Sequence, residues 1–164
     1  MKYLPIAALL AVLPTLALAD APAPLGANGG KFGNWTAATY GTGAAKICYA
    51  FTTPQISKPN WKSRGKVMLT VTQRHGSRDE VSLTAGYAYP KTASVKLTVG
   101  TTPFDFYTSG ANAFTSSGTA VVTAFKSADS AATKGTGPKG KPVEDSFSLT
   151  GFSAAYKAIS AACP

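Results

Sequence analysis

Apolar and polar residues alternate with a period of two along much of the chain, which is the pattern of half-buried antiparallel strands. The clearest runs cover residues 45–52, 66–74, 80–85, 94–99, 103–108 and 145–150. Clusters of glycine, serine and proline separate these runs, for example at residues 75–77 and 109–110. Short strands in this order predict an all-β-dominated fold, an antiparallel sandwich or barrel-like domain.

Two later segments have helical spacing. Apolar side chains recur on one helical face over residues 152–163, which predicts a short C-terminal helix with Ser153 as its N-cap. Residues 119–126 fit either a further short helix or a strand. Residues 135–142 are rich in Gly, Pro and Lys and are expected to form a loop.

The first nineteen residues have the pattern of a secretory signal peptide. Lys2 supplies the positive start, an apolar run follows, and residues 17–19 read Ala-Leu-Ala, so cleavage is expected before Asp20. The apolar run is too short to cross a bilayer, and no later segment predicts a transmembrane span. Residues 20–31, rich in Ala, Pro and Gly, are expected to be a flexible lead-in. Residues 32–164 then form a single β-rich domain, with Trp35 expected in its core.

The cysteine count agrees with export. Cys48 and Cys163 are the two cysteines of the chain, and an exported chain with an even count favours a disulfide, although two separate buried thiols are the alternative. Two cysteines and one histidine are too few for a structural zinc site, which takes four ligands. No metal and no cofactor are therefore expected.

Short matches to catalytic motifs lack the structural context that their chemistry needs. His75 lies in a turn between two strand patterns, where nothing predicts the buried, oriented imidazole of a catalytic triad. The S-x-x-K match at residues 63–66 contains Gly65 and precedes a strand instead of lying on a helix. The glycine-rich match at 135–141 is followed by Pro142, where a phosphate loop has Ser or Thr. The sequence thus predicts a protein that is not an enzyme.

Basic residues are the more suggestive feature. Removal of Lys2 with the leader leaves fifteen Lys and Arg against seven Asp and Glu, a net charge of about +8, and such a balance favours anionic partners. Six basic residues fall within about twenty positions around Trp61. Arg64, Lys66, Arg74 and Arg78 are the candidate contact patch for an anionic lipid, glycan or envelope protein; a solvated positive rim is the alternative. Specific nucleic-acid recognition is not expected, because no reading helix or stacking motif is evident.

Several segments together resemble the invasion-associated locus B family of exported bacterial proteins. They are Phe-Gly-Asn-Trp at 32–35, Lys-Ile-Cys-Tyr-Ala at 46–50, Glu-Val-Ser at 80–82 and the stretch from 145 to 155 that continues to Cys163. The resemblance implies an all-β-dominated envelope protein with no established catalytic residues, and it favours the helix at 119–126. The loop at 135–142 departs from the family by its Lys and Pro content.

These observations lead to one hypothesis and two alternatives. The hypothesis is a non-enzymatic binding protein of the periplasm or the outer surface, based on the leader, the cysteine pair, the basic charge and the absence of a catalytic motif. A periplasmic hydrolase of unrecognised type would need a concave pocket with convergent polar groups. A structural envelope component is the second alternative.

Overall fold

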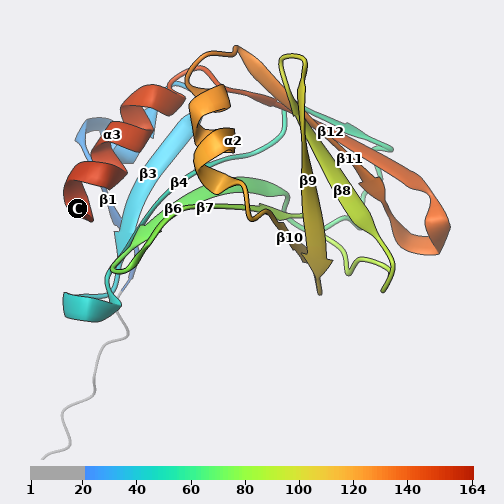
Figure 1. Cartoon of the computed structure of the whole chain (residues 1–164), viewed down its shortest axis with the longest axis horizontal. Helices are drawn as coiled ribbons and strands as arrows, with labels where there is room; N and C mark the ends of the chain where they lie inside the picture. Colours follow the sequence, from blue (N-terminus) through green and yellow to red (C-terminus); the bar gives the residue numbers. More distant parts are fainter. Residues whose placement is uncertain (1–20) are drawn as a thin grey trace, which may run out of the picture.

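The computed structural model describes residues 21–164, so the expected signal peptide, residues 1–19, lies outside the described residues (Figure 1). The strands, in chain order, are β1 (Ala23–Pro24), β2 (Lys31–Phe32), β3 (Trp35–Tyr40), β4 (Ile47–Thr52), β5 (Ile56–Lys58), β6 (Met68–Arg74), β7 (Ser77–Thr84), β8 (Ser94–Val99), β9 (Thr102–Ser109), β10 (Asn112–Phe114), β11 (Ser130–Thr136) and β12 (Pro142–Ser148). The helices are α1 (Ala27–Gly30), α2 (Gly118–Phe125) and α3 (Phe152–Ala162), with 3-10 turns at Gly43–Ala45 and Pro138–Gly140. Within residues 21–164, no helix combines the length and apolar character that a bilayer span needs.

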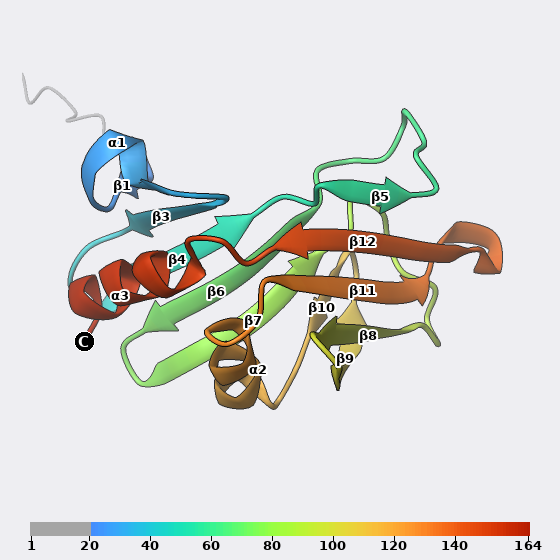
Figure 2. The ribbon, with the colours of Figure 1, turned by 90° about the horizontal axis from the view of Figure 1, so that it is seen from above.

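All the strands belong to one antiparallel sheet of strong curvature. Its order is β1-β3-β4-β6-β7-β10-β9-β8-β11-β12-β5, and β2 pairs with β3. Residues 53–55 connect β4, the third strand from one end of this order, directly to β5 at the other end, where β5 pairs with β12 (Figure 2). One antiparallel sheet thus dominates the described residues, and the all-β-dominated prediction is confirmed.

The core lies where the inner faces of the curved sheet meet the two longer helices. Trp35 is completely buried, and its ring packs against Phe152 at 4.8 Å and Phe125 at 6.1 Å between centroids. Its Nε1 donates a hydrogen bond to the Ser148 carbonyl oxygen at 3.1 Å, which satisfies the buried indole N–H and ties β3 to β12. Trp35 is thus a core residue, as predicted. The largest buried aliphatic and aromatic partners are Leu69, Leu83, Leu97, Phe125, Phe147, Phe152 and Ile159.

The C-terminal helix α3 is held against β3 and β4 by its apolar face and by three links at its end (Figure 1). Cys163 forms the predicted disulfide with Cys48 on β4, over a sequence separation of 115. Lys46 Nζ donates to the Ala162 carbonyl oxygen at 2.9 Å, and Arg78 Nη1 donates to that of Cys163 at 2.5 Å. These donors compensate carbonyls that the last turn of a helix leaves without intrahelical partners.

The start of α3 differs from the expectation that Ser153 caps it. The N-cap position is Gly151, in the left-handed region with φ of 90°, and no side chain caps the helix. A Cβ at Gly151 would lie 1.9 Å from the carbonyl oxygen of Phe32. The close approach of the β2–β3 turn therefore sets this helix start, a tertiary constraint that local sequence does not show.

The segment 119–126 is helical, as one of the two alternatives had it. Val121, Val122 and Phe125 are buried, and α2 packs against β7 and β8. β10 pairs with β7 only at Ser82–Thr84, so α2 lies beside the part of β7 that β10 does not reach.

The lead-in expected to be flexible is ordered in the described part of the chain. β1 pairs with β3, and the Leu25 N–H donates to the Ala37 carbonyl oxygen at 2.9 Å. Its backbone groups thus satisfy the free edge of β3, which composition alone does not reveal. The loop between β11 and β12 is also shorter than the expected 135–142, since β11 runs to Thr136 and β12 begins at Pro142.

Asp79 links the β6–β7 hairpin to both longer helices. It has a left-handed backbone with φ of 55°, and its carboxylate accepts hydrogen bonds from Gln73 Nε2, Thr119 Oγ1 and Tyr156 Oη at 2.8–3.2 Å. Burial alone would raise the pKa of Asp79. The three hydrogen bonds and the nearby positive charge of Arg78 outweigh burial, and the pKa lies below its usual value. The ionised form is therefore the structural form.

We expect the double variant Cys48→Ala/Cys163→Ala to lose about 2–5 kcal/mol of unfolding free energy, because the disulfide restricts a long loop of the unfolded chain. Urea unfolding with and without reductant measures this loss. Reductant should lower the stability of the wild type to that of the variant and leave the variant unchanged. Equal stability of the two proteins without reductant would contradict the prediction.

We expect Asp79→Asn to destabilise the protein at neutral pH, with a difference from wild type that shrinks as the pH falls below about 4. The lowered pKa means that the carboxylate contributes stability above its unfolded-state pKa, and this contribution is lost as the pH falls through the folded-state value. Unfolding curves from about pH 7 to about pH 2 measure the difference. A difference that stays constant with pH would show that ionisation of Asp79 is irrelevant.

Candidate functional site

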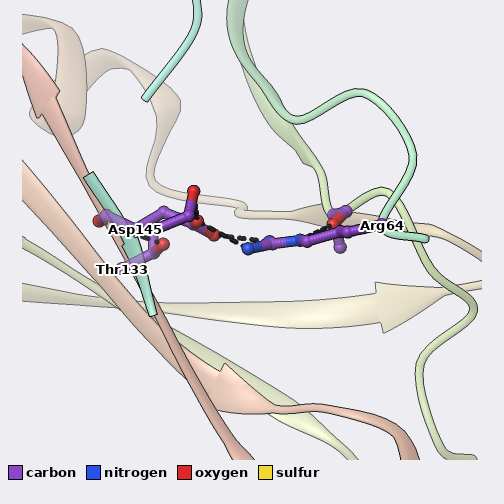
Figure 3. Close-up of polar contacts among 5 residues, drawn as sticks. Arg64, Thr133 and Asp145 are labelled. Carbon is purple, nitrogen blue, oxygen red and sulfur yellow. Dashed lines mark hydrogen bonds and ion pairs between the residues drawn. The ribbon is translucent and has the colours of Figure 1, made fainter. Parts of the chain in front are cut away.

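Arg64, expected at a surface patch, is instead buried in an ion pair with Asp145 of β12. The side chains of Arg64 and Asp145 are 6% and 2% exposed. Arg64 Nη1 and Nη2 donate to Asp145 Oδ1 and Oδ2 at 2.7 and 2.6 Å, a bidentate arrangement (Figure 3). Arg64 Nε also donates to the Ala85 carbonyl oxygen at 2.8 Å. The guanidinium thus connects the loop before β6 to the end of β7 and to β12.

The remaining polar atoms around this ion pair are also satisfied. Ser57 Oγ of β5 donates to Asp145 Oδ1 at 2.6 Å, and Thr133 Oγ1 of β11 donates to the Asp145 carbonyl oxygen at 3.5 Å. Such saturation is what makes a buried ion pair tolerable, because each charge gives up its hydration. Arg64 is therefore a structural residue, and the prediction that it contacts a partner directly is wrong.

Aromatic side chains surround the Arg64 guanidinium. Its central carbon lies 5.3 Å from the ring centroid of Trp61 and 5.4 Å from that of Tyr87, within cation–π range. Tyr89 packs edge-on against Tyr87 at 5.0 Å. Burial raises the pKa of Tyr87 and of Tyr89, so both phenols are neutral at neutral pH. The ion pair thereby orients Trp61 at the surface of the molecule.

The loop that carries Trp61 and Arg64 is set by a close backbone approach. The Gly65 N–H donates to the Gly86 carbonyl oxygen at 2.9 Å. Gly86 has φ of 75°, and a Cβ there would lie 2.3 Å from the carbonyl oxygen of Gly65. Glycine at position 86 is therefore required for this loop to dock against the end of β7.

Trp61 lines an open groove between its own loop and the β11–β12 turn. The groove has a volume of about 430 Å³, and a second groove of about 480 Å³ adjoins it through the shared Pro59 and Lys141. The side chains that line the two are Lys58, Pro59, Trp61, Ser63, Pro138, Lys139, Lys141, Pro142 and Glu144. The surface thus combines prolines and one aromatic side chain with three lysines.

The charge of this groove is unbalanced. Lys58, Lys139 and Lys141 are exposed, and none has a carboxylate partner within residues 21–164. Glu144, the acidic lining residue, is paired with Lys134 at 3.1 Å. The lysine and proline content of the loop at 135–142 was the feature of the sequence that could have indicated this groove. Trp61 was a second such feature.

The other three members of the expected patch lie apart from the groove or from one another. Lys66 is exposed, with its Nζ 5.8 Å from the ring centroid of Phe51. Arg74 pairs with Glu80 at 2.7 Å, and Arg78 donates to the carbonyl of Cys163. Strand β6 separates Lys66 from Arg74 by about 26 Å, at 3.3 Å per residue. The four residues therefore form no single patch, and residues 139–141 supply the lysines that sequence reasoning had sought elsewhere.

A clustered metal site is also not seen, because no group of three or more His, Cys, Asp or Glu lies within ligating reach in the described part of the chain.

We expect Arg64→Met and Asp145→Leu each to lose about 3–5 kcal/mol of unfolding free energy, since each leaves an unpaired buried charge. The double variant should lose much less than the sum of the two. Denaturant unfolding of all four proteins measures the coupling. The matched control is Lys134→Met with Glu144→Leu, an exposed pair on β11 and β12, where about 0–1 kcal/mol is expected. Additive losses at positions 64 and 145 would contradict the role of the ion pair.

Comparison with known proteins gives one match. The family model for invasion associated locus B (IalB) protein matches residues 35–160, which is most of the chain. No curated protein and no solved structure matches it. The match spans the region from Trp35 on β3 into helix α3 and includes the loops that form the groove. The chain therefore belongs to the invasion-associated locus B family.

Proposed function

We propose that this protein is an exported, non-enzymatic binding protein of the bacterial envelope, which holds an acidic glycan in the groove beside Trp61. The observation that carries the proposal is the set of three exposed lysines without ion-pair partners among the described residues, Lys58, Lys139 and Lys141, around an aromatic and proline-lined surface. Lysine ammonium groups attract carboxylate or phosphate substituents. An aromatic ring offers an apolar face on which a sugar ring packs.

Three observations support export. The leader pattern of residues 1–19, the disulfide between Cys48 and Cys163, and the family match all agree with an oxidising compartment outside the cytoplasm. Location in the periplasm or at the outer surface is equally compatible with them.

The rigid support of Trp61 favours a ligand with a ring over a bare anionic surface. Arg64, immobilised by Asp145, lies against the indole, so the aromatic side chain is held in position before any ligand arrives. Preorganisation of this kind lowers the entropy that binding costs. A flat phospholipid surface would need the lysines but would gain little from a fixed ring.

We expect Lys139→Ala/Lys141→Ala to bind polygalacturonate or purified lipopolysaccharide about ten- to thirtyfold more weakly than wild type, at about 1 kcal/mol per lysine. Raising the salt from about 50 to about 300 mM should weaken the binding of wild type. Isothermal titration calorimetry measures both effects. Trp61→Ala should weaken binding of these glycans but leave attachment to phosphatidylglycerol vesicles unchanged.

The matched control removes two exposed lysines at another place. Lys31 on β2 and Lys157 on α3 lie on elements that contact each other, far along the sheet order from the groove. Lys31→Ala/Lys157→Ala therefore has the same net charge as the groove variant and should bind like wild type. An equal loss of glycan affinity in the two double variants would show that only net charge matters and would contradict a groove site. Glycan binding that salt does not weaken would also contradict it.

A further inference from the structure

The outer face of the sheet carries another groove, which lies on other strands than the groove lined by Lys58, Lys139 and Lys141. It lies over β6, β7, β10 and β9, which are successive neighbours (Figure 1), and its volume is about 350 Å³. Its polar and aromatic lining residues are Thr72, Arg74, Glu80, Ser82, Tyr107, Phe114 and Thr115.

Two aromatic rings form one wall of this outer groove. Tyr107 and Phe114 are directly paired across β9 and β10, with ring centroids 5.8 Å apart and ring planes at 33°. Tyr107 is 62% exposed, which is unusual for so large an apolar side chain and is not explained by the packing of the core. An exposed aromatic pair on a rigid sheet is a surface on which a flat, partly apolar ligand can pack.

Hydroxyl groups continue the same row across the sheet. Phe114 pairs with Ser82 on β7, and Ser82 pairs with Thr70 on β6. Thr70 in turn pairs with Phe51 on β4. Directly paired residues point to the same face, so two aromatic, two hydroxyl-bearing and one further aromatic side chain form one row over five neighbouring strands.

The charges of the outer groove cancel. Arg74 Nη2 pairs with Glu80 Oε2 at 2.7 Å, and Ser77 Oγ donates to Glu80 Oε1 at 2.7 Å. Both charged side chains remain partly exposed, at 46% and 38%. They therefore keep free donor and acceptor capacity toward the groove while adding no net charge. A neutral ligand rich in hydroxyl groups satisfies such a pair, whereas an acidic ligand would meet Glu80.

We propose that this outer groove binds a neutral pyranose oligosaccharide. Tyr107 and Phe114 pack against the apolar faces of the sugar rings. Arg74 and Glu80 bond their hydroxyl groups as donor and acceptor, and Ser82 and Thr72 supply further polar contacts. The site is independent of the lysine groove, because it lies on other strands and favours a neutral ligand, whereas the lysine groove favours an acidic one.

Calorimetric titration with chitohexaose, cellohexaose and maltohexaose tests the proposal. At least one should bind, with an affinity that salt does not change. Tyr107→Ala should weaken that binding about five- to tenfold, whereas Tyr107→Phe should preserve it, since the ring is kept. Tyr107 is exposed, so neither substitution removes core packing.

The two sites are separable by crossing variants and ligands. Lys139→Ala/Lys141→Ala should bind the neutral oligosaccharide like wild type, and Tyr107→Ala should bind polygalacturonate like wild type. Failure of all three neutral probes to bind would overturn the outer-groove proposal, as would binding that Tyr107→Ala leaves unchanged. Neither result affects the lysine groove, which is tested separately by the salt dependence of acidic-glycan binding and by the lysine variants.

Discussion

The ion pair between Arg64 and Asp145 is the interaction on which the docking of the loop before β6 against β12 and the shape of the candidate site both depend. A guanidinium and a carboxylate that leave water together need complete hydrogen bonding. Four segments of the sheet supply it: the loop before β6, the end of β7, and strands β5 and β12. The requirement fixes where these segments lie relative to one another. The position of Trp61 follows, because its ring packs against the same guanidinium.

The charge on the molecular surface is distributed in a way that net charge does not describe. Several basic side chains bond to other parts of the protein: Arg64 pairs with Asp145, and Arg78 and Lys46 bond to carbonyls at the end of α3. Three exposed lysines lie together on the β11–β12 turn and on β5, whereas others, such as Lys31, Lys66 and Lys157, lie apart from them. The face formed by β6, β7, β10 and β9 is close to neutral and rich in hydroxyls. One small domain thus offers two surfaces of different chemistry.

Period-two alternation predicted β4, β6, β7, β8, β9 and β12, because each has one face in the core and one toward water. It missed the short strands β1, β2, β5 and β10, which have two or three residues each. It also missed β3 and β11, whose inward side chains are, apart from Trp35, small or polar ones such as Ala37, Ala131 and Thr133. Arg64 was misjudged for a different reason. A basic residue in a loop normally lies in water, and its partner is 81 positions away in sequence. Long-range pairing of this kind leaves no local pattern, and neither does the meeting of residues 139–141 with Trp61.

The link between Cys48 and Cys163 encloses nearly all of the domain in one covalent ring. A single cut by a protease at any exposed turn within that ring, such as the one at Gly76, opens the backbone without releasing a fragment. The two pieces stay joined through sulfur and through the sheet, in which β4 lies between β3 and β6 and contacts α3. In a compartment that contains proteases, both proposed binding surfaces would stay on one covalently joined molecule after such a cut, for as long as the disulfide is intact.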